Sequence, residues 1–245
     1  MAKLDKTKYS KEEASRLMEI RRLEKQSPII TKVVEVEKTL PIDNNRYQHN
    51  QQNSFVLGNG VSRASIDPED LKKYGPIYGC NALYRTFRPD YLIAVDVKMI
   101  LEINKSGFQH HNQVWTNHNK SYNGIKNLNY FQPSKGWSSG PTALWLASQH
   151  SHKRIFILGF DYKGLKDGAK FNNVYADSPN YKKSQDSATF FGNWLRQTVS
   201  VVKEHEKTEY IRVITSDNYC PEELNKLVNY KTIHLEEFKK MFVLS

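Results

Sequence analysis

Two short apolar segments of the chain end in residues that could bind a phosphorylated ligand. Residues 54–57 predict a buried strand that breaks into Gly58-Asn59-Gly60, and residues 77–80 predict a second strand that ends at the amide side chain of Asn81. Glycines at a strand end let the backbone approach a phosphate, and the oriented amides of such a turn form an anion-binding concavity. We therefore predict a nucleotide site here. Its first residues would be Gly58, Asn59, Gly60, Ser62 and Asn81.

A second group of candidate residues surrounds a predicted helix start at Ser138-Ser139-Gly140-Pro141. Serine hydroxyls cap helix amides or contact an anion, and proline fits the first helical turn. Residues 91–95 and 154–158 predict strands that lead to acidic residues. Because ligands in open α/β sheets lie outside the carboxyl ends of strands, these residues extend the predicted site. The added residues are Asp96, Ser138, Ser139, Gly140 and Asp161.

The glycine turn differs from two well-defined phosphate-binding loops. A Walker loop would require Gly-Lys-Ser/Thr, which does not follow these glycines. The dinucleotide-binding fingerprint would have a third glycine where Arg63 stands and an acidic residue where Asn81 stands. The sequence therefore argues against a P-loop NTPase and against an NAD-dependent enzyme.

Strand and helix patterns alternate at short spacing from residue 54 onward. This alternation predicts an α/β fold, a Rossmann-like, doubly wound, mostly parallel sheet with helices on both faces. Further helices are predicted at 68–74, 97–104, 187–206 and 235–242, and further strands at 114–116, 128–131 and 210–215. Phe190, Phe191 and Trp194 lie on the apolar stripe of the helix at 187–206, so we predict that they are core residues and not an aromatic nucleic-acid surface.

Two segments do not fit the alternating pattern. Residues 163–184 directly follow Asp161-Tyr162 and have no periodicity, which favours a lid over the substrate. Residues 1–53 form an N-terminal extension, with a short amphipathic helix at 10–25, a weak edge strand at 31–40 and a polar linker at 43–53. We place the boundary of the nucleotide-binding domain, residues 54–245, after this linker. The helix could dock a protein partner or simply face solvent.

Composition limits the partners and the compartment. The 245 residues carry a net charge of +10 without a block of like charges, which favours a positive site for a phosphorylated ligand over a nucleic-acid-binding arm. Cys80 and Cys220 form neither a disulfide framework nor a CxxC pair. No run approaches the ~20 apolar residues of a membrane span. We expect a cytoplasmic protein with no permanently bound cofactor or metal.

The motifs together resemble a known family. Gly58-Asn59-Gly60-Val61-Ser62, Cys80-Asn81, the strand ending at Asp96, Ser138-Ser139-Gly140 and Gly159-Phe160-Asp161-Tyr162 have the order and approximate spacing of the bacterial lipooligosaccharide sialyltransferases. They are equally similar to the related group of motility-accessory glycosyltransferases and 6-hydroxymethylpterin diphosphokinases. The resemblance covers residues 54–162. It implies a Rossmann-like domain that uses a CMP- or UDP-linked sugar without a metal, with Tyr162 near the phosphate and a glycan or other hydroxyl compound as acceptor.

Two departures from the sialyltransferase pattern leave alternatives open. Ser184-Gln185-Asp186-Ser187 stands where that family has a catalytic histidine, so Asp186 is either a replacement base or a plain helix cap. Asp96 stands where the sialyltransferases have asparagine, and Asp96 with Asp161 could hold Mg²⁺ against a pyrophosphate. A glycosyltransferase is the favoured function. The alternatives are a Mg²⁺-dependent pyrophosphokinase and an inactive member that serves as a binding or assembly protein through residues 1–53.

Overall fold

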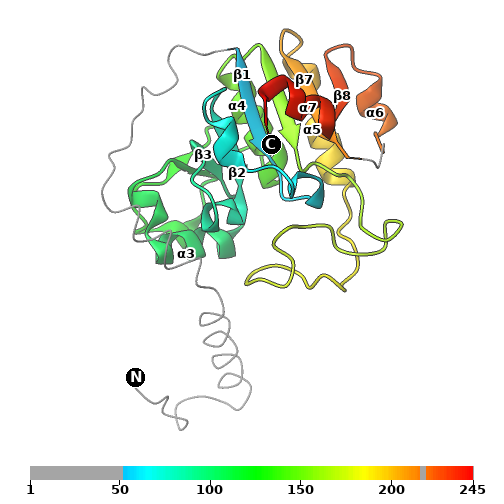
Figure 1. Ribbon diagram of the computed structural model, residues 1–245. Helices are drawn as coiled ribbons and strands as arrows, with labels where there is room; N and C mark the ends of the chain where they lie inside the picture. Colours follow the sequence, from blue (N-terminus) through cyan, green and yellow to red (C-terminus); the bar gives the residue numbers. More distant parts are fainter. Residues whose placement is uncertain (1–51, 216–218, 245) are drawn as a thin grey trace. The chain divides into compact units, whose positions relative to one another are not determined.

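The computed structural model describes residues 52–215 and 219–244, which belong to the unit Leu40–Ser245 (Figure 1). They form an eight-stranded sheet of order β5-β4-β3-β2-β1-β6-β7-β8 in which neighbouring strands are parallel. The strands are β1 (Asn53–Leu57), β2 (Ile77–Cys80), β3 (Tyr91–Ile93), β4 (Val114–Thr116), β5 (Asn129–Tyr130), β6 (Arg154–Leu158), β7 (Glu209–Ile214) and β8 (Tyr230–His234).

The order of the strands reverses between β1 and β6. The chain adds β2 to β5 on one side of β1, and then crosses back to add β6, β7 and β8 on the other side. β1 and β6 pair in register from Asn53↔Arg154 to Leu57↔Leu158. This arrangement confirms the predicted Rossmann-like, doubly wound α/β fold.

Helices cover both faces of the sheet (Figure 1). They are α3 (Val97–Ser106), α4 (Ser139–Gln149), α5 (Gly192–Glu204), α6 (Glu222–Asn225) and α7 (Leu235–Phe242). Successive side chains of a strand point to opposite faces. Phe55 and Leu57 of β1 therefore pack in one apolar cluster with α3 and α7, whereas Val56 packs in a second cluster with α4 and α5. Because both faces are buried, the strands appear in the sequence as continuous apolar runs.

Short 3-10 helices fill several connections between strands. They are η2 (Val61–Arg63), η3 (Pro68–Leu71), η4 (Asn81–Arg85), η5 (Phe108–His110) and η6 (Lys120–Tyr122). The helix predicted at 68–74 is thus η3, which is shorter and more tightly wound. η4 follows β2 directly, and η2 follows β1 after the glycine turn at residues 58–60, so both lie at the carboxyl ends of these strands.

The structure corrects two predictions in the C-terminal half. α5 begins at Gly192, not at residue 187, and Phe190 lies outside the core with 74% of its surface exposed. The predicted assignment of Phe190 to the buried stripe was therefore wrong, because the stripe was extended back into residues that are not helical. β8, with its pattern of isolated buried residues, was not predicted at all.

A long connection links β6 to α5. Residues 159–191 contain no helix or named strand, and only the isolated bridges Leu165↔Lys170 and Lys170↔Ser187 interrupt the irregular backbone. The connection, drawn in yellow-green, leaves the sheet at its carboxyl edge (Figure 1). The elements predicted before residue 52 lie outside the described residues. Among the helices that are described, none combines the length and apolar character needed to cross a membrane.

Candidate functional site

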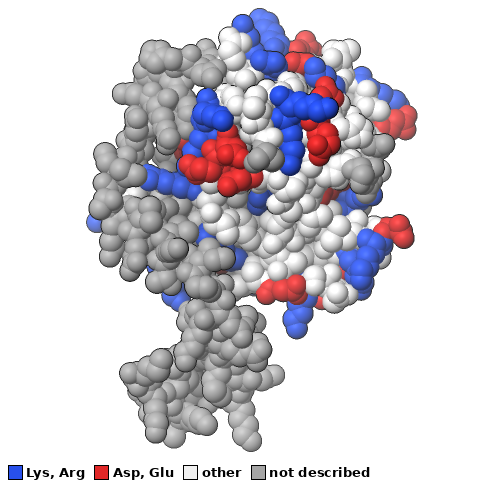
Figure 2. All heavy atoms as spheres, viewed as in Figure 1, with Lys and Arg blue, Asp and Glu red and all other residues white. Residues whose placement is uncertain are grey.

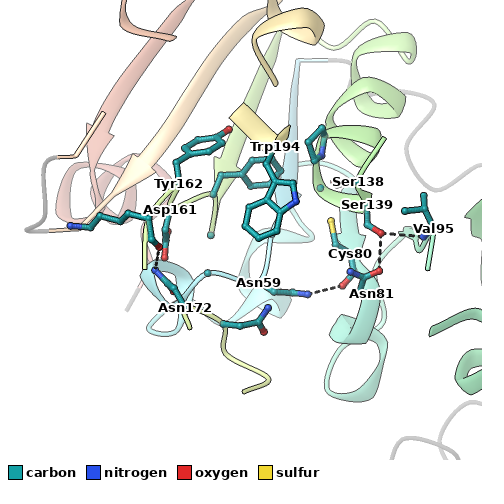
Figure 3. A pocket seen from close by; sticks show the side chains of 18 of the residues that line it. Asn59, Cys80, Asn81, Val95, Ser138, Ser139, Asp161, Tyr162, Asn172 and Trp194 are labelled. Atoms are coloured by element: carbon teal, nitrogen blue, oxygen red, sulfur yellow. Dashed lines mark hydrogen bonds between the residues drawn. The ribbon is translucent and has the colours of Figure 1, made fainter. Parts of the chain in front are cut away.

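A pocket of about 310 Å³ opens at the carboxyl edge of the sheet, beside the point where the strand order reverses (Figure 3). Such a reversal leaves a crevice between connections that run to opposite faces of the sheet, and it is the usual ligand site of this fold class. The structure brings ten predicted residues together around the pocket. They are Gly58, Asn59, Gly60, Asn81, Asp96, Ser138, Ser139, Gly140, Asp161 and Tyr162.

The floor of the pocket is the contact between Gly58 and Gly159, which follow β1 and β6. The Gly58 N–H donates to the Leu158 carbonyl at 2.8 Å, and the Gly60 N–H donates to the Gly159 carbonyl at 2.9 Å. A Cβ on Gly58 would lie 2.5 Å from the Gly159 oxygen, and Gly159 has a left-handed φ of +70°. These glycines are therefore required by the close approach of two strand ends.

The amides of the glycine turn bond to the protein itself, in contrast to the predicted phosphate cradle. The Ser62 N–H donates to Asp161 Oδ2 at 3.2 Å, and the Ser62 hydroxyl donates to Asp161 Oδ1. The Val61 N–H donates to Asn172 Oδ1 at 2.9 Å. The Asp161 carboxylate thus sits where we had expected an external anion, and Ser62 holds Asp161 without lining the pocket.

The start of α4 forms the opposite wall of the pocket. Ser138 is the N-cap residue, yet its side chain accepts no hydrogen bond from the first helical turn. Its own N–H donates to Gln197 Oε1 at 3.1 Å. The first N–H groups of a helix have no partner within the helix, and they carry the positive end of its dipole. In α4 these groups belong to Ser139 and Gly140, which line the pocket.

Ser139 fixes the orientation of Asn81. The Val95 N–H donates to Ser139 Oγ at 3.1 Å, and Ser139 Oγ lies 2.8 Å from Asn81 Oδ1 (Figure 3). Because a backbone N–H can only donate, the Ser139 hydroxyl proton is directed to Asn81. The Ser139 hydroxyl thereby uses one of the two acceptor positions of the Asn81 oxygen, and the NH₂ group of Asn81 can donate to a ligand.

Asp96 adds a carboxylate to the same end of the pocket. It directly follows Val95 and occupies the N-cap position of α3, but its side chain does not cap that helix. An N-cap aspartate usually stabilises its helix by about 0.5–2 kcal/mol through such a bond. The Asp96 side chain lines the pocket instead.

Tyr162 and Cys80 contribute apolar surface to the pocket. The Tyr162 hydroxyl donates to Thr198 Oγ1 of α5 at 2.9 Å, and burial raises the pKa of this phenol above its ordinary value. The ring lines the pocket, but the hydroxyl bonds to α5. Burial also raises the pKa of the Cys80 thiol to about 12, although the charge of Arg63 lowers it slightly. Cys80 is therefore a protonated thiol at neutral pH and not a nucleophile.

Asp186 lies away from the pocket-lining residues. Its carboxylate accepts the N–H of Lys183 at 2.8 Å in an exposed turn. The predicted helix cap is wrong, because α5 begins at Gly192 with Phe191 as its N-cap; the Asp186 carboxylate caps a turn within the connection instead. In this conformation it contacts no other predicted site residue.

The predicted lid residues form one side of the site. The Val174 N–H donates to the Asn59 carbonyl at 2.8 Å, and the Tyr181 hydroxyl accepts the Ala82 N–H at 3.3 Å. The long connection after β6 therefore passes over the glycine turn and the start of η4. Asn172 and Asn173 of this connection line the pocket.

Sequence reasoning missed several lining residues. Lys163 directly follows a predicted site residue, so its position could have been found from the strand end alone. Asn172 and Asn173 lie in a segment without periodicity, which gave no signal. Trp194 was predicted to be core, and it does pack partly against the core, but one side of it also lines the pocket.

The described residues contain no group of three or more His, Cys, Asp and Glu side chains that could hold a metal ion. A Mg²⁺ ion that is bound mainly by substrate phosphates needs only one or two carboxylates. We found no match to the chain among protein-family models or among curated proteins.

Proposed function

We propose that the protein is a nucleotide-sugar-dependent glycosyltransferase of the sialyltransferase-like type, which transfers a sugar to a hydroxyl acceptor. The observation that carries the proposal is the uncapped N-terminus of α4, which opens into a pocket at the reversal of strand order. Helix N-termini bind phosphate because their N–H groups and dipole favour negative charge. Ser138, Ser139 and Gly140 would hold the phosphate of the donor.

The side chains beside the start of α4 support a nucleoside. Asn81 would donate a hydrogen bond through its NH₂ group, and the Asp96 carboxylate would accept one from a ligand hydroxyl or amino group. Within the pocket lining, the carboxylates are those of Asp96 and Asp161. Both oxygens of Asp161 already accept bonds from Ser62. Asp96 is therefore the better candidate to take the proton of an acceptor hydroxyl, in place of Asp186.

Ser138→Asp tests the phosphate site directly. A carboxylate at an N-cap accepts the free amides and neutralises the helix dipole, so the helix is stabilised while the place of the phosphate is filled. In wild-type protein, a nucleotide at 100 times its Kd should raise the free energy of unfolding by about 2.7 kcal/mol. We expect Ser138→Asp to fold at least as stably as wild type and to lose this ligand-induced stabilisation, measured by thermal shift with CMP, UMP, CMP-sialic acid, UDP-sugars and ATP.

His234→Asp is the matched control. His234 is the exposed N-cap residue of α7, its side chain makes no capping bond, and it does not line the pocket. The same new residue at this cap should leave nucleotide binding unchanged. Wild-type affinity in Ser138→Asp would contradict a phosphate site at α4. If wild-type protein is stabilised by none of the nucleotides, the transferase proposal fails and a binding role without a nucleotide is favoured.

A second candidate function rests on the two carboxylates in one pocket. If Asp96 and Asp161 hold Mg²⁺ against a pyrophosphate, ATP should stabilise the protein only when Mg²⁺ is present. If a cytidine or uridine nucleotide raises the melting temperature equally with Mg²⁺ and with EDTA, the glycosyltransferase is favoured. The same thermal-shift panel, with Mg²⁺ and with EDTA, therefore separates the two enzymes.

A further inference from the structure

Three aromatic side chains form a cluster near the pocket, which we call the aromatic rim: the exposed Phe190 and Tyr219, and the half-buried Phe191 between them. The Phe190 ring is 74% exposed and stacks near Phe191, with 6.2 Å between ring centroids. Phe191 contacts Tyr219 edge-on at 6.4 Å, and Tyr219 is 36% exposed. A contiguous exposed apolar patch can mark a binding site, and here the exposed Phe190 ring contacts Phe191, which in turn contacts Tyr219.

The aromatic rim adjoins the pocket through two residues. Lys163 lines the pocket, and its Nζ lies 5.8 Å from the centroid of the Tyr219 ring. Trp194 also lines the pocket, three residues after Phe191, which is the N-cap of α5. A molecule bound on the rim would therefore lie next to a ligand in the pocket.

The connection that carries Phe190 and Phe191 has a small excess of positive charge. The connection at residues 163–191 contains five lysines and three aspartates, a net charge of +2. Asp177 accepts the Ser184 N–H and Asp186 accepts the Lys183 N–H, whereas Lys170 and Lys182 donate to the carbonyls of Gln185 and Ser187. On the face in view in Figure 2, basic and acidic side chains are interspersed. Phe190 and Phe191 thus belong to a connection with a small excess of lysine, and Lys163 of that connection contacts Tyr219.

We propose that the aromatic rim binds a single-stranded nucleic acid, whose bases stack on the rings while its phosphates lie near the lysines. Rings and lysines together are the usual means of binding single strands without sequence preference, because every base has a flat face and every nucleotide has a charge. A neutral partner would gain nothing from the lysines, and an acidic peptide would offer few flat rings to the phenylalanines. This proposal depends on the proposed function in one respect: the single-stranded nucleic acid would supply the hydroxyl group that accepts the sugar.

Phe190→Ala in the full-length protein tests the stacking contact. Fluorescence anisotropy with a labelled 12-nucleotide oligothymidylate should show an affinity that is about 5- to 100-fold weaker than wild type, the range measured for loss of one base–aromatic stack. Phe190→Trp should retain or improve the affinity. Because the ring is exposed, its removal should leave the fold intact, which circular dichroism can verify.

Val228→Ala is the control for loss of an exposed apolar side chain. Val228 is fully exposed and lies between α6 and β8, outside the rim. Its affinity for the oligonucleotide should equal that of wild type. The proposal is overturned if Phe190→Ala binds as tightly as wild type, since the affinity would then come from net charge alone. It is also overturned if Phe190→Ala weakens binding of the acidic polysaccharide heparin as much as it weakens oligonucleotide binding.

Nucleotide binding by the same variants distinguishes this inference from the proposed function. Phe190→Ala should keep the thermal shift caused by the nucleotide, and Ser138→Asp should keep its affinity for the oligonucleotide. If the oligonucleotide binds but no mononucleotide or nucleotide sugar does, the rim is a nucleic-acid surface and the transferase proposal alone fails. If these nucleotides bind but the oligonucleotide does not, only the proposal for the rim fails.

Discussion

At the level of single residues, Gly58 and Gly159 approach each other closely at the floor of the pocket. Gly159 combines a φ of +70° with a Cβ position 2.8 Å from the Gly58 carbonyl oxygen. A left-handed conformation costs a non-glycine residue about 1–2 kcal/mol, and overpacking costs about 1–3 kcal/mol more. We expect Gly159→Ala to lower the free energy of unfolding by about 2–4 kcal/mol, measured by urea denaturation.

Gly124→Ala separates the two contributions. Gly124 has a φ of +87°, but a Cβ there would meet no atom within 4 Å. This variant should therefore lose only about 1–2 kcal/mol, the cost of the left-handed conformation. Equal losses in the two variants would mean that the contact between the strand ends is not tight in solution.

Some site residues could be predicted from the sequence because the sheet alone fixes their positions. Asn81, Asp96 and Ser139 stand at strand ends or at a helix start, and the parallel sheet brings these points to one edge whatever the details of packing. The hydrogen bonds from Ser62 to Asp161 could not be predicted, because they depend on how two turns approach one another. The sequence also gave no means of deciding between a base and a cap at Asp186, since both roles use the same residue type.

At the level of elements, the connection after β6 is attached through a half-buried carboxylate on α3. Glu102 accepts hydrogen bonds from Arg85 Nε at 2.7 Å and from Asn180 Nδ2 at 2.6 Å, and Arg85 also donates to the Pro179 carbonyl at 2.8 Å. Burial opposes ionisation of Glu102, but the hydrogen bonds from Arg85 and its neighbours outweigh burial and lower the pKa. α3 and η4 thus hold the connection through one ionised group.

Acid should release this connection. A carboxyl group whose pKa is lowered in the folded state stabilises it fully above the unfolded-state pKa, and this stabilisation is lost as the pH falls through the lower, folded value. We expect hydrogen exchange at residues 174–183 to be slow at pH 7, after correction for intrinsic exchange, and to quicken below the ordinary glutamate value of 4.5.

Glu102→Gln should exchange quickly in these residues already at pH 7, because the amide cannot accept the same bonds from Arg85. Glu69→Gln, which breaks the exposed ion pair between Glu69 and Lys72 in η3, should leave the exchange unchanged. A connection that is equally protected in Glu102→Gln would show that other contacts, such as that of Tyr181 with Ala82, hold it.

Element boundaries were predicted well where an apolar run or a helix stripe begins and ends sharply. α7 and β4 agree with the predicted ranges, whereas the start of α5 was placed five residues too early. Phe190 and Phe191 continue the apolar composition of the stripe, so composition alone cannot show that the helix begins only at Gly192. β8 was missed because it lies at the sheet edge, where fewer of its residues are buried.

At the level of the whole molecule, the two apolar clusters have different relations to the pocket. α7 lies on the face opposite α4 and α5, where the fully buried Phe238 packs against Phe55 and Phe156 with ring centroids 6.3 Å and 5.6 Å away. Phe238→Ala should lower the free energy of unfolding by about 3–5 kcal/mol. Below its melting temperature, the folded variant should bind nucleotide with wild-type affinity, measured by calorimetry.

Met241→Ala on the same helix is the matched control, because Met241 is 44% exposed. We expect a loss of no more than about 1 kcal/mol from it, as for a surface substitution. A marked loss of nucleotide affinity in Phe238→Ala would show that the two faces of the sheet are coupled. The overall fold was predictable for the reason that makes these faces separable: the central strands β1, β2 and β6 are apolar on both faces.

β1 and β6 pair in the sheet but are far apart in the sequence, so the pocket-lining residues come from two separate stretches of the chain. Residues up to 96 supply one wall of the pocket, from Gly58 to Asp96, and residues from 138 onward supply the other, from Ser138 to Trp194. No lining residue lies between them. A recombination junction anywhere in that interval would exchange one wall as a unit and leave the other intact. If the pocket binds a nucleotide as proposed, a single crossover would exchange the residues around Asn81 and Asp96 and keep those at the start of α4.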